Sequence, residues 1–167
     1  MADLLPQERL QPSLLDRLRD DDPTHTQESR DKRVLSVNKL RESVLRDLGW
    51  LLNATALEAV LDLTDTSYAA ASVINFGMPN LSGIAASGID ATALEQRLRQ
   101  AILHFEPRLL PNSLKIKVLT AGEEMSLNAL SFLIEADLWA QPIPTHLYIR
   151  STLDLETGHV EVSEGAR

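Results

Sequence analysis

The hydrophobic pattern changes its period at Pro107, and this change constrains the fold more than any other feature of the 167-residue chain. Before Pro107, apolar residues recur at helical spacing, whereas after it apolar and polar residues alternate as they do in strands. Proline has no N–H and disfavours helical dihedrals at the residue before it, so the preceding helix should end at Glu106. This order predicts an α+β fold, with helices packed on an antiparallel sheet of about four strands.

Two amphipathic helices are clear in the half before Pro107. The first is predicted over 36–53, where charged residues alternate with a stripe of apolar ones: Val37, Leu40, Val44, Leu48, Leu51 and Leu52. The second begins after Asp90, whose carboxylate can cap the first turn, and it ends at Phe105. Each helix should bury its apolar stripe against a common core.

The region between these two helices gives weaker signals. A short helix is predicted over 68–75, with Gly77 as a left-handed cap, and 80–88 is a Gly/Ser-rich loop. For residues 55–66 the sequence leaves two alternatives, a further helical turn and a buried loop.

The half after Pro107 predicts an antiparallel meander. Turns are expected at 122–124 and at 157–158, because glycine and polar residues gather there. The alternating segments predict four strands, over 114–118, 130–138, 146–151 and 159–162.

The N-terminal residues 1–33 are predicted to form an arm, and 34–167 the main domain. A short helix at 13–20 should begin at Ser13, because Asp16 follows three residues later as in a weaker form of the capping box. The helix contains Arg17 and an apolar cluster of Leu14, Leu15 and Leu18. Such a short helix needs a surface to lie on.

Composition excludes several classes of function. The net charge of −8 argues against a nucleic-acid binder, because phosphate neutralisation needs clustered Lys and Arg. There is no cysteine, which excludes disulfides and thiolate metal sites and fits the reducing cytosol. No secretory signal or membrane-spanning run is present, so we expect a cytoplasmic protein without direct membrane insertion.

The tripeptide Glu106-Pro107-Arg108 fixes a carboxylate and a guanidinium around a rigid break. The planar fork of an arginine can bind a carboxylate or backbone carbonyls at two points, which suits recognition of another protein. The alternative is that Glu106 and Arg108 merely pair with each other or cap local backbone.

Four motifs resemble one family in order and spacing. They are Pro12-Ser13-Leu14-Leu15-Asp16-Arg17-Leu18, Leu48-Gly49-Trp50-Leu51-Leu52-Asn53, Ser72-Val73-Ile74-Asn75-Phe76-Gly77-Met78-Pro79 and Phe105-Glu106-Pro107-Arg108. Together they resemble the TssE family, the baseplate wedge subunits of bacterial type VI secretion systems. This family is related to a phage-tail baseplate wedge family that was historically labelled lysozyme-like.

The resemblance implies a structural subunit with a fold similar to part of the sheath subunits. It would bind the baseplate proteins TssF, TssG and TssK at the cytosolic face of the inner membrane. It would also help to nucleate polymerisation of the TssB/TssC sheath, and an exposed edge strand suits that task because it can pair with a neighbour's strand.

The family resemblance assigns partner binding to Glu106, Pro107 and Arg108. We expect Glu106→Ala or Arg108→Ala to leave the isolated fold intact and to weaken assembly. The arm offers a second partner-binding segment, in which the leucines dock into a groove on a wedge partner. It consists of Ser13, Leu14, Leu15, Asp16, Arg17 and Leu18. The alternative is that these leucines fold back on the protein's own sheet.

The lysozyme-like label raises the alternative of a peptidoglycan glycoside hydrolase. That chemistry needs two facing carboxylates, one of which has a raised pKa, but Arg108 should favour the ionised form of Glu106. Glu135 and Asp137 share a strand face, as solvated residues of a sheet commonly do. We therefore predict no catalytic residues and no cofactor.

Two further groups of residues carry alternatives of their own. Four scattered histidines (His25, His104, His146 and His159) lack metal-ligand spacing, so no metal site is predicted. For Trp50 and Trp139 one alternative is the role of an interface anchor, and for Trp50 the other is a position in the core.

Overall fold

The computed structural model describes residues 13–18, 36–78, 90–119, 129–139 and 144–165. The predicted loop at 80–88 and the turn at 122–124 lie outside these ranges. The helical elements are α1 (Leu14–Leu18), α2 (Val37–Asn53), η3 (Leu57–Ala59), α3 (Ser67–Ala70), η4 (Val73–Asn75) and α4 (Ala91–Phe105). The strands are β1 (Lys115–Leu119), β2 (Ala129–Leu138), β3 (Thr145–Asp154) and β4 (Val160–Glu164).

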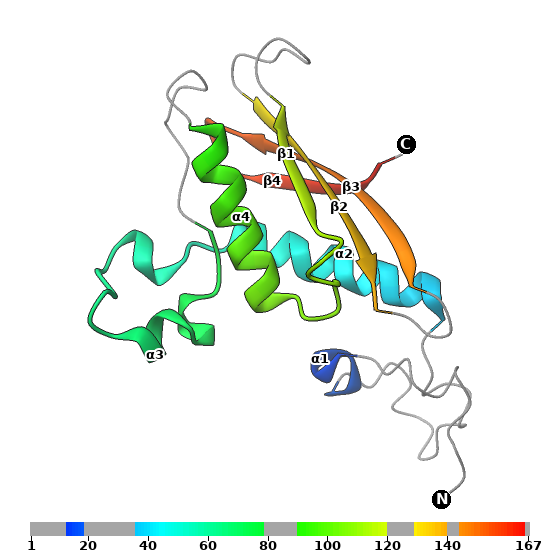
Figure 1. Ribbon diagram of the computed structural model, residues 1–167, viewed down its shortest axis with the longest axis horizontal. Coiled ribbons are helices and arrows are strands. Elements are labelled where there is room, and N and C mark those ends of the chain that lie inside the picture. The colour runs from blue at the N-terminus through cyan, green and yellow to red at the C-terminus, as the bar shows by residue number, and fades with distance from the viewer. Residues whose placement is uncertain (1–12, 19–35, 79–89, 120–128, 140–143, 166–167) are drawn as a thin grey trace, which may run out of the picture.

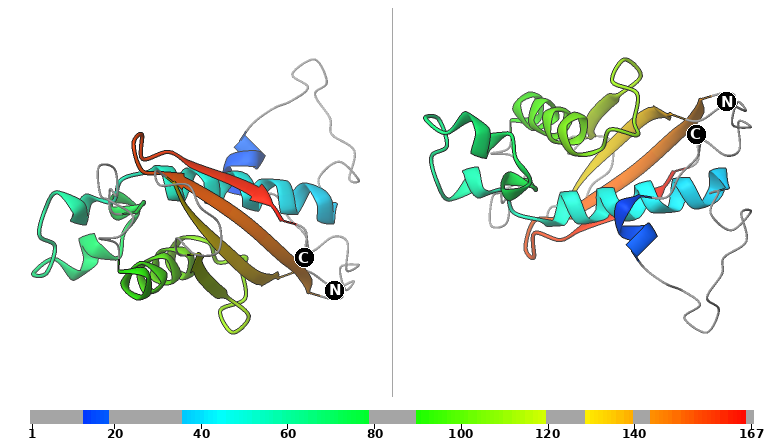
Figure 2. Two further views of the ribbon diagram at one scale, coloured as in Figure 1. Left: turned by 90° about the horizontal axis from the view of Figure 1, so that it is seen from above. Right: turned by 90° about the horizontal axis from the view of Figure 1, so that it is seen from below.

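The four strands form one antiparallel sheet in the order β1-β2-β3-β4, which confirms the predicted α+β fold with an antiparallel meander. Every second residue of β2 and β3 is buried, so one face of the sheet carries the core and the other faces solvent. Figure 1 shows the strands above α2 and beside α4, with α1 beneath α2. The views in Figure 2 show β4 running alongside α2, while β1 lies beside α4.

Aliphatic side chains from both long helices and from the sheet fill a single core. The fully buried residues include Val44, Leu48, Leu98, Ile102, Ile134, Leu138, Leu147 and Ile149. Because Ile134 and Ile149 are opposite each other in the β2–β3 register, they form the centre of the buried sheet face. The arrangement follows from the two predicted periodicities.

The predicted cap of α4 is confirmed, and α2 begins at a cap of the same kind. The Ser36 side chain accepts a hydrogen bond from the Lys39 N–H at 3.2 Å, and Asp90 accepts one from the Ala93 N–H at 3.1 Å. Helix α4 ends at Phe105, and Glu106 has the non-helical dihedrals φ −122° and ψ 75° ahead of Pro107.

The predicted helix at 68–75 is wrong in its length, because two short pieces, α3 and η4, replace it. Buried Asn75 causes the break. Its side chain accepts a hydrogen bond from the Glu58 N–H at 2.9 Å and donates one to the Ala70 carbonyl at 3.0 Å. A tertiary contact thus replaces the hydrogen bonds of a continuous helix, which periodicity alone does not reveal.

Gly77 is not a left-handed helix cap, although its φ of 136° is positive. It lies where the chain passes close to the end of α2, and Met78 exchanges backbone hydrogen bonds with Ala54 and Ala56. A Cβ at Gly77 would lie 2.4 Å from the Ala54 carbonyl oxygen. Glycine is needed here both for its φ and for this close approach.

Candidate functional site

Glu106 and Arg108 form a closed pair around Pro107. The Arg108 Nε donates to Glu106 Oε1 at 2.6 Å, the Arg108 Nη2 donates to Oε2, and the Arg108 backbone N–H donates to Oε1 at 3.2 Å. Only 3% of Glu106 is exposed, whereas 22% of the Arg108 side chain is. The two side chains therefore do pair with each other, and Glu106 orients the guanidinium, although Arg108 has further partners.

Arg108 also joins the end of α4 to α2. Its Nη2 lies 2.5 Å from Asp47 Oδ2, and its Nη1 donates to Ser43 Oγ at 3.2 Å. The backbone is held as well, because the Arg108 carbonyl accepts from the Trp139 N–H at 2.7 Å, at the end of β2. The motif is thus fixed to a helix and to the sheet at the same time.

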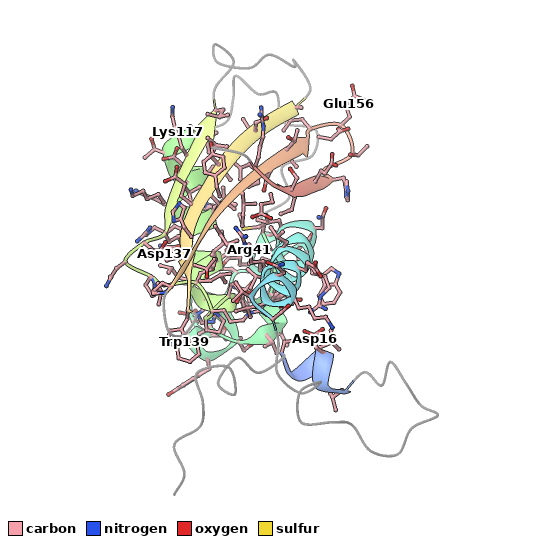
Figure 3. The ribbon with its side chains drawn as sticks, turned by 90° about the vertical axis from the view of Figure 1, so that its right-hand side faces the viewer. Asp16, Arg41, Lys117, Asp137, Trp139 and Glu156 are labelled. Carbon is pink, nitrogen blue, oxygen red and sulfur yellow. The ribbon has the colours of Figure 1, made fainter. Side chains whose placement is uncertain are left out.

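The charges continue from Asp47 to the N-terminal helix. Arg46 donates to Asp47 Oδ1 at 2.8 Å and to both oxygens of Asp16, at 2.5 and 3.2 Å. Figure 3 shows Asp16 on α1, next to α2. We call the resulting chain of alternating charges the charge network; it consists of Asp16, Arg46, Asp47, Arg108 and Glu106.

The pKa values in the charge network follow from these contacts. The hydrogen bond from Arg46 lowers the pKa of Asp16, against the effect of burial. Burial of Arg108 disfavours its charge, but the hydrogen bonds that it donates to Glu106 and Asp47 outweigh this and raise its pKa. The hydrogen bond that Arg46 donates to Asp16 likewise raises the pKa of Arg46. All these shifts favour the ionised forms, as expected of ion pairs that hold elements together.

Helix α1 lies on α2 and not on the sheet. Ser13 caps it, since its Oγ accepts from the Asp16 N–H at 3.3 Å and donates to Asp16 Oδ2 at 2.8 Å. Leu15 and Leu18 are 54% and 75% exposed, so for these two the expected alternative of folding back on the sheet is wrong. The side chains of Leu14 and Arg17 lie outside the described part.

A hollow of about 400 Å³ lies beside the tripeptide. Leu15 from α1 and Trp50 from α2 line it together with Pro107, Phe76 and Phe105. Trp50 is 49% exposed and stacks under the Arg46 guanidinium, 4.9 Å from the ring centre. The core alternative for Trp50 is therefore wrong, and an exposed aromatic next to an apolar hollow suits contact with another protein.

The two edges of the sheet differ in how their backbone groups are satisfied. At β1, the Glu95 side chain of α4 accepts from the Val118 N–H at 2.8 Å, and Arg99 donates to the Leu114 carbonyl. Side chains of α4 therefore occupy one outward N–H of β1 and the carbonyl of the residue before the strand, which protects part of this edge.

The β4 edge is open over part of its length. Because the Gly165 N–H bonds to the Tyr148 carbonyl and the Asp154 N–H to the His159 carbonyl, alternation turns the backbone groups of Val160, Val162 and Glu164 away from β3. Asn53 of α2 occupies those of Val160, accepting from its N–H at 2.9 Å and donating to its carbonyl at 2.8 Å. The backbone N–H and carbonyl groups of Val162 and Glu164, further along β4, point away from the sheet.

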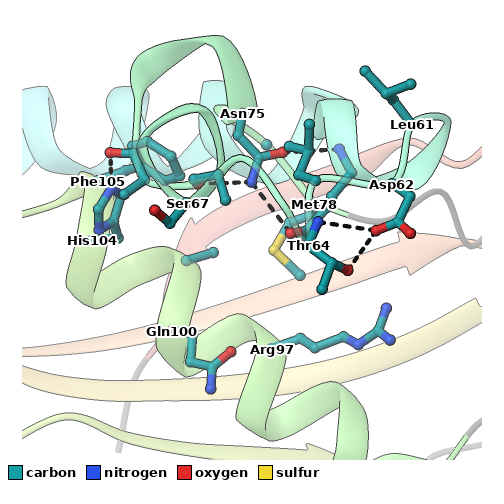
Figure 4. Close-up of a pocket in the computed structure, with 16 residues that line it drawn as sticks. Leu61, Asp62, Thr64, Ser67, Asn75, Met78, Arg97, Gln100, His104 and Phe105 are labelled. Atoms are coloured by element: carbon teal, nitrogen blue, oxygen red, sulfur yellow. Dashed lines mark hydrogen bonds between the residues drawn. The ribbon is translucent and has the colours of Figure 1, made fainter.

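The hollow shown in Figure 4, about 630 Å³, lies between α4 and the segment from η3 to Met78. The carboxylate of Asp62, which lines the hollow, does not suit a general acid. Hydrogen bonds from Thr64 lower the pKa of Asp62, and the Asn75 side chain binds Glu58 at 3.2 Å. The His104 ring binds the Ala71 carbonyl at 2.8 Å. A glycosidase needs the opposite shift, an acid whose pKa is raised.

Glu135 and Asp137 lie on the outer sheet face, as expected, and Asp137 pairs with His146 at 2.7 Å. No group of three or more metal-ligating side chains occurs within the described ranges, and His25 lies outside them. None of the helices in the described part has the length and apolar character that a membrane crossing requires.

The sequence analysis did not predict the partners of Arg108, nor the contact between the Asn53 side chain and the backbone of Val160 in β4. Ser43 and Asp47 are four residues apart on α2, beside the apolar stripe, and this polar pair next to a core face is the signal that could have found them. The role of Asn53 at Val160 carries no sequence signal, because it depends on where the β3–β4 hairpin packs.

A protein-family comparison matches residues 38–143, well over half of the chain, to a family described as baseplate wedge protein gp25. The matched part includes α2, α4, the tripeptide and the first two strands. No curated protein and no solved structure matches the chain.

Proposed function

Because the chain belongs to the gp25 family of baseplate wedge proteins and so has a structural role in a baseplate, we propose that it is the TssE-like wedge subunit of a bacterial type VI secretion system. The observation that carries the proposal is the family match, which covers Glu106, Pro107 and Arg108 together with the two helices that hold them. The four sequence motifs support the assignment to the secretion system. The proposed location is the cytoplasm, at the cytosolic face of the inner membrane.

The proposed contact with TssF, TssG and TssK is made by the surface around the charge network. Buried Glu106 orients Arg108, and Pro107 holds the spacing, so the guanidinium and its surroundings are preorganised before a partner arrives. Leu15 and Trp50 add exposed apolar area beside them. Such a surface suits a helix that carries both apolar and polar side chains.

The N-terminal arm, 1–33, is proposed as a separate binding segment attached to a wedge domain of 34–167. Its exposed Leu15 and Leu18 would enter a groove on a wedge partner, while the ion pair between Asp16 and Arg46 keeps α1 in place. Ser13, Leu14 and Arg17 belong to the same proposed segment.

The proposed contact with the TssB/TssC sheath is strand pairing at β4. The support is the contrast between the edges, because Glu95 and Arg99 of α4 bind backbone groups at β1, whereas Val162 and Glu164 turn their backbone groups outward. A strand offered by a sheath subunit would extend the sheet by main-chain hydrogen bonds and would start polymerisation there.

Coexpression with TssF and TssG, followed by size-exclusion chromatography, tests the assignment. We expect the protein to comigrate with both partners. The hydrolase alternative would instead be supported by a protein that elutes separately from both partners and cleaves purified peptidoglycan. The Glu106→Gln variant should then have lost this cleavage. The charge network argues against that outcome, because Arg108 already binds both oxygens of the Glu106 carboxylate.

A further inference from the structure

Gly49 lies in the middle of α2, where glycine is among the poorest helix formers. Two ordinary reasons for a glycine within a helix are absent at this position. Its φ is not positive, and a Cβ built on it would meet no atom within 4 Å outside its own helix and its chain neighbours. Internal packing therefore does not explain why this helix lacks a side chain here.

The open space at Gly49 belongs to a groove of about 700 Å³ between α2 and β4. Leu45 and Trp50 of α2 and Val162 of β4 line the groove on either side of the glycine. Leu45 and Val162 are half-buried and pack against the core, so the floor is apolar. A side chain at position 49 would project into this space.

The groove lies beside the β4 edge, between two contacts that α2 makes with this strand. Asn53 occupies the backbone groups of Val160 at one end. At the other end, Arg41 forms an ion pair with Glu164 at 2.6 Å. The length of chain that can pair here is therefore short, centred on Val162.

We propose that Gly49 is a specificity-determining residue for the strand that pairs with β4. The incoming segment places an apolar side chain opposite Val162, in the space over Gly49 between Leu45 and Trp50. Its neighbouring residues point to the solvent face, where they meet Glu161, and so they are basic. The occupant is thus a short extended segment of a neighbouring subunit with alternating basic and apolar residues. This inference rests on the proposed strand pairing at β4.

A peptide titration followed by NMR tests the inference on the full chain. The probe is a hexapeptide of alternating lysine and valine, and a lysine–glycine hexapeptide is the matched probe without apolar side chains. We expect the lysine–valine peptide to shift the amide signals of Gly49 and Val162. The lysine–glycine peptide should bind at least about tenfold more weakly.

Three variants separate this inference from the proposed function. Gly49→Leu fills the groove and should weaken binding of the lysine–valine peptide at least about tenfold, which corresponds to about 1.4 kcal/mol. Glu42→Leu, an exposed α2 position that does not line the groove, should leave binding unchanged. Val162→Pro removes an outward N–H and should abolish binding.

Each outcome decides between the two claims. If Val162→Pro abolishes binding and Gly49→Leu does not change it, strand pairing stands and the role of Gly49 is overturned. If neither variant changes binding of a peptide that shifts these signals, both claims fail. The variant Gly49→Ala is the control for folding. Because alanine favours the helix, this variant should raise the melting temperature.

Discussion

Arg108 and Asp47, which are 61 residues apart in the sequence, are joined by a hydrogen bond of 2.5 Å between Nη2 and Oδ2. Because Glu106 binds the same guanidinium, one arginine connects the end of α4 to the middle of α2. The tripeptide is therefore part of the fold as well as of the proposed partner surface.

Removing Arg108 should destabilise the isolated protein. Arg108→Ala leaves the buried Glu106 carboxylate without its partner, so we expect a loss of about 3 kcal/mol in the free energy of unfolding by denaturant titration. Exposed Arg97→Ala on α4 is the control and should change it by less than about 0.5 kcal/mol. This replaces the sequence-based expectation of an intact fold, and equal stabilities of the two variants would contradict it.

Docking of α1 should depend on pH through Asp16. The folded pKa of Asp16 lies below its unfolded value near 3.8, so its stabilising contribution is complete above that value and is lost as the pH falls through the lower, folded pKa. In a Trp139→Phe background, Trp50 fluorescence should report the release of α1, because Arg46 contacts both Trp50 and Asp16.

The variant Asp16→Asn provides the control for this titration. It removes the charge that Arg46 binds, so at neutral pH its Trp50 spectrum should already match that of the acid-released helix. Its far-UV circular dichroism should keep the signal of α2 and α4, which shows that the rest of the fold is intact. A Trp50 spectrum unchanged by both the substitution and acid would contradict the role of Asp16.

Alanine substitutions of Gly49 and Gly77 should change the free energy of unfolding in opposite directions. Gly77→Ala puts a Cβ 2.4 Å from the Ala54 carbonyl oxygen at a positive φ and should lower the free energy of unfolding by about 1–3 kcal/mol. Gly49→Ala places its Cβ in open space and should raise it by about 0.5–1 kcal/mol. Thermal melts of both variants against the wild type measure the contrast, and a shift of the same sign would contradict it.

Local patterns were sufficient to predict the long helices and the strands. The stripe from Leu40 to Leu51 and the alternation in β2 each repeat often enough to identify an element, and Asp90 and Pro107 mark where α4 begins and ends. The break between α3 and η4 was missed because Asn75 bonds to Glu58, seventeen residues away.

The site was predictable only in part for the same reason. The pairing of Glu106 with Arg108 is local, so the sequence offered it as an alternative. The bond from Arg108 to Asp47 and the contrast between the two sheet edges depend on how helices pack against strands. Side chains such as Glu95 and Asn53 acquire their roles only from that packing.

Amide hydrogen exchange in the assembled complex tests the central claim most directly. The wedge subunit, in complex with TssF and TssG, is compared before and after addition of TssB and TssC. The account predicts that the amides of Val162 and Glu164 become protected, whereas the Val118 amide, already bound by Glu95, does not change. Unchanged exchange at β4 while the sheath assembles on the complex would contradict the account.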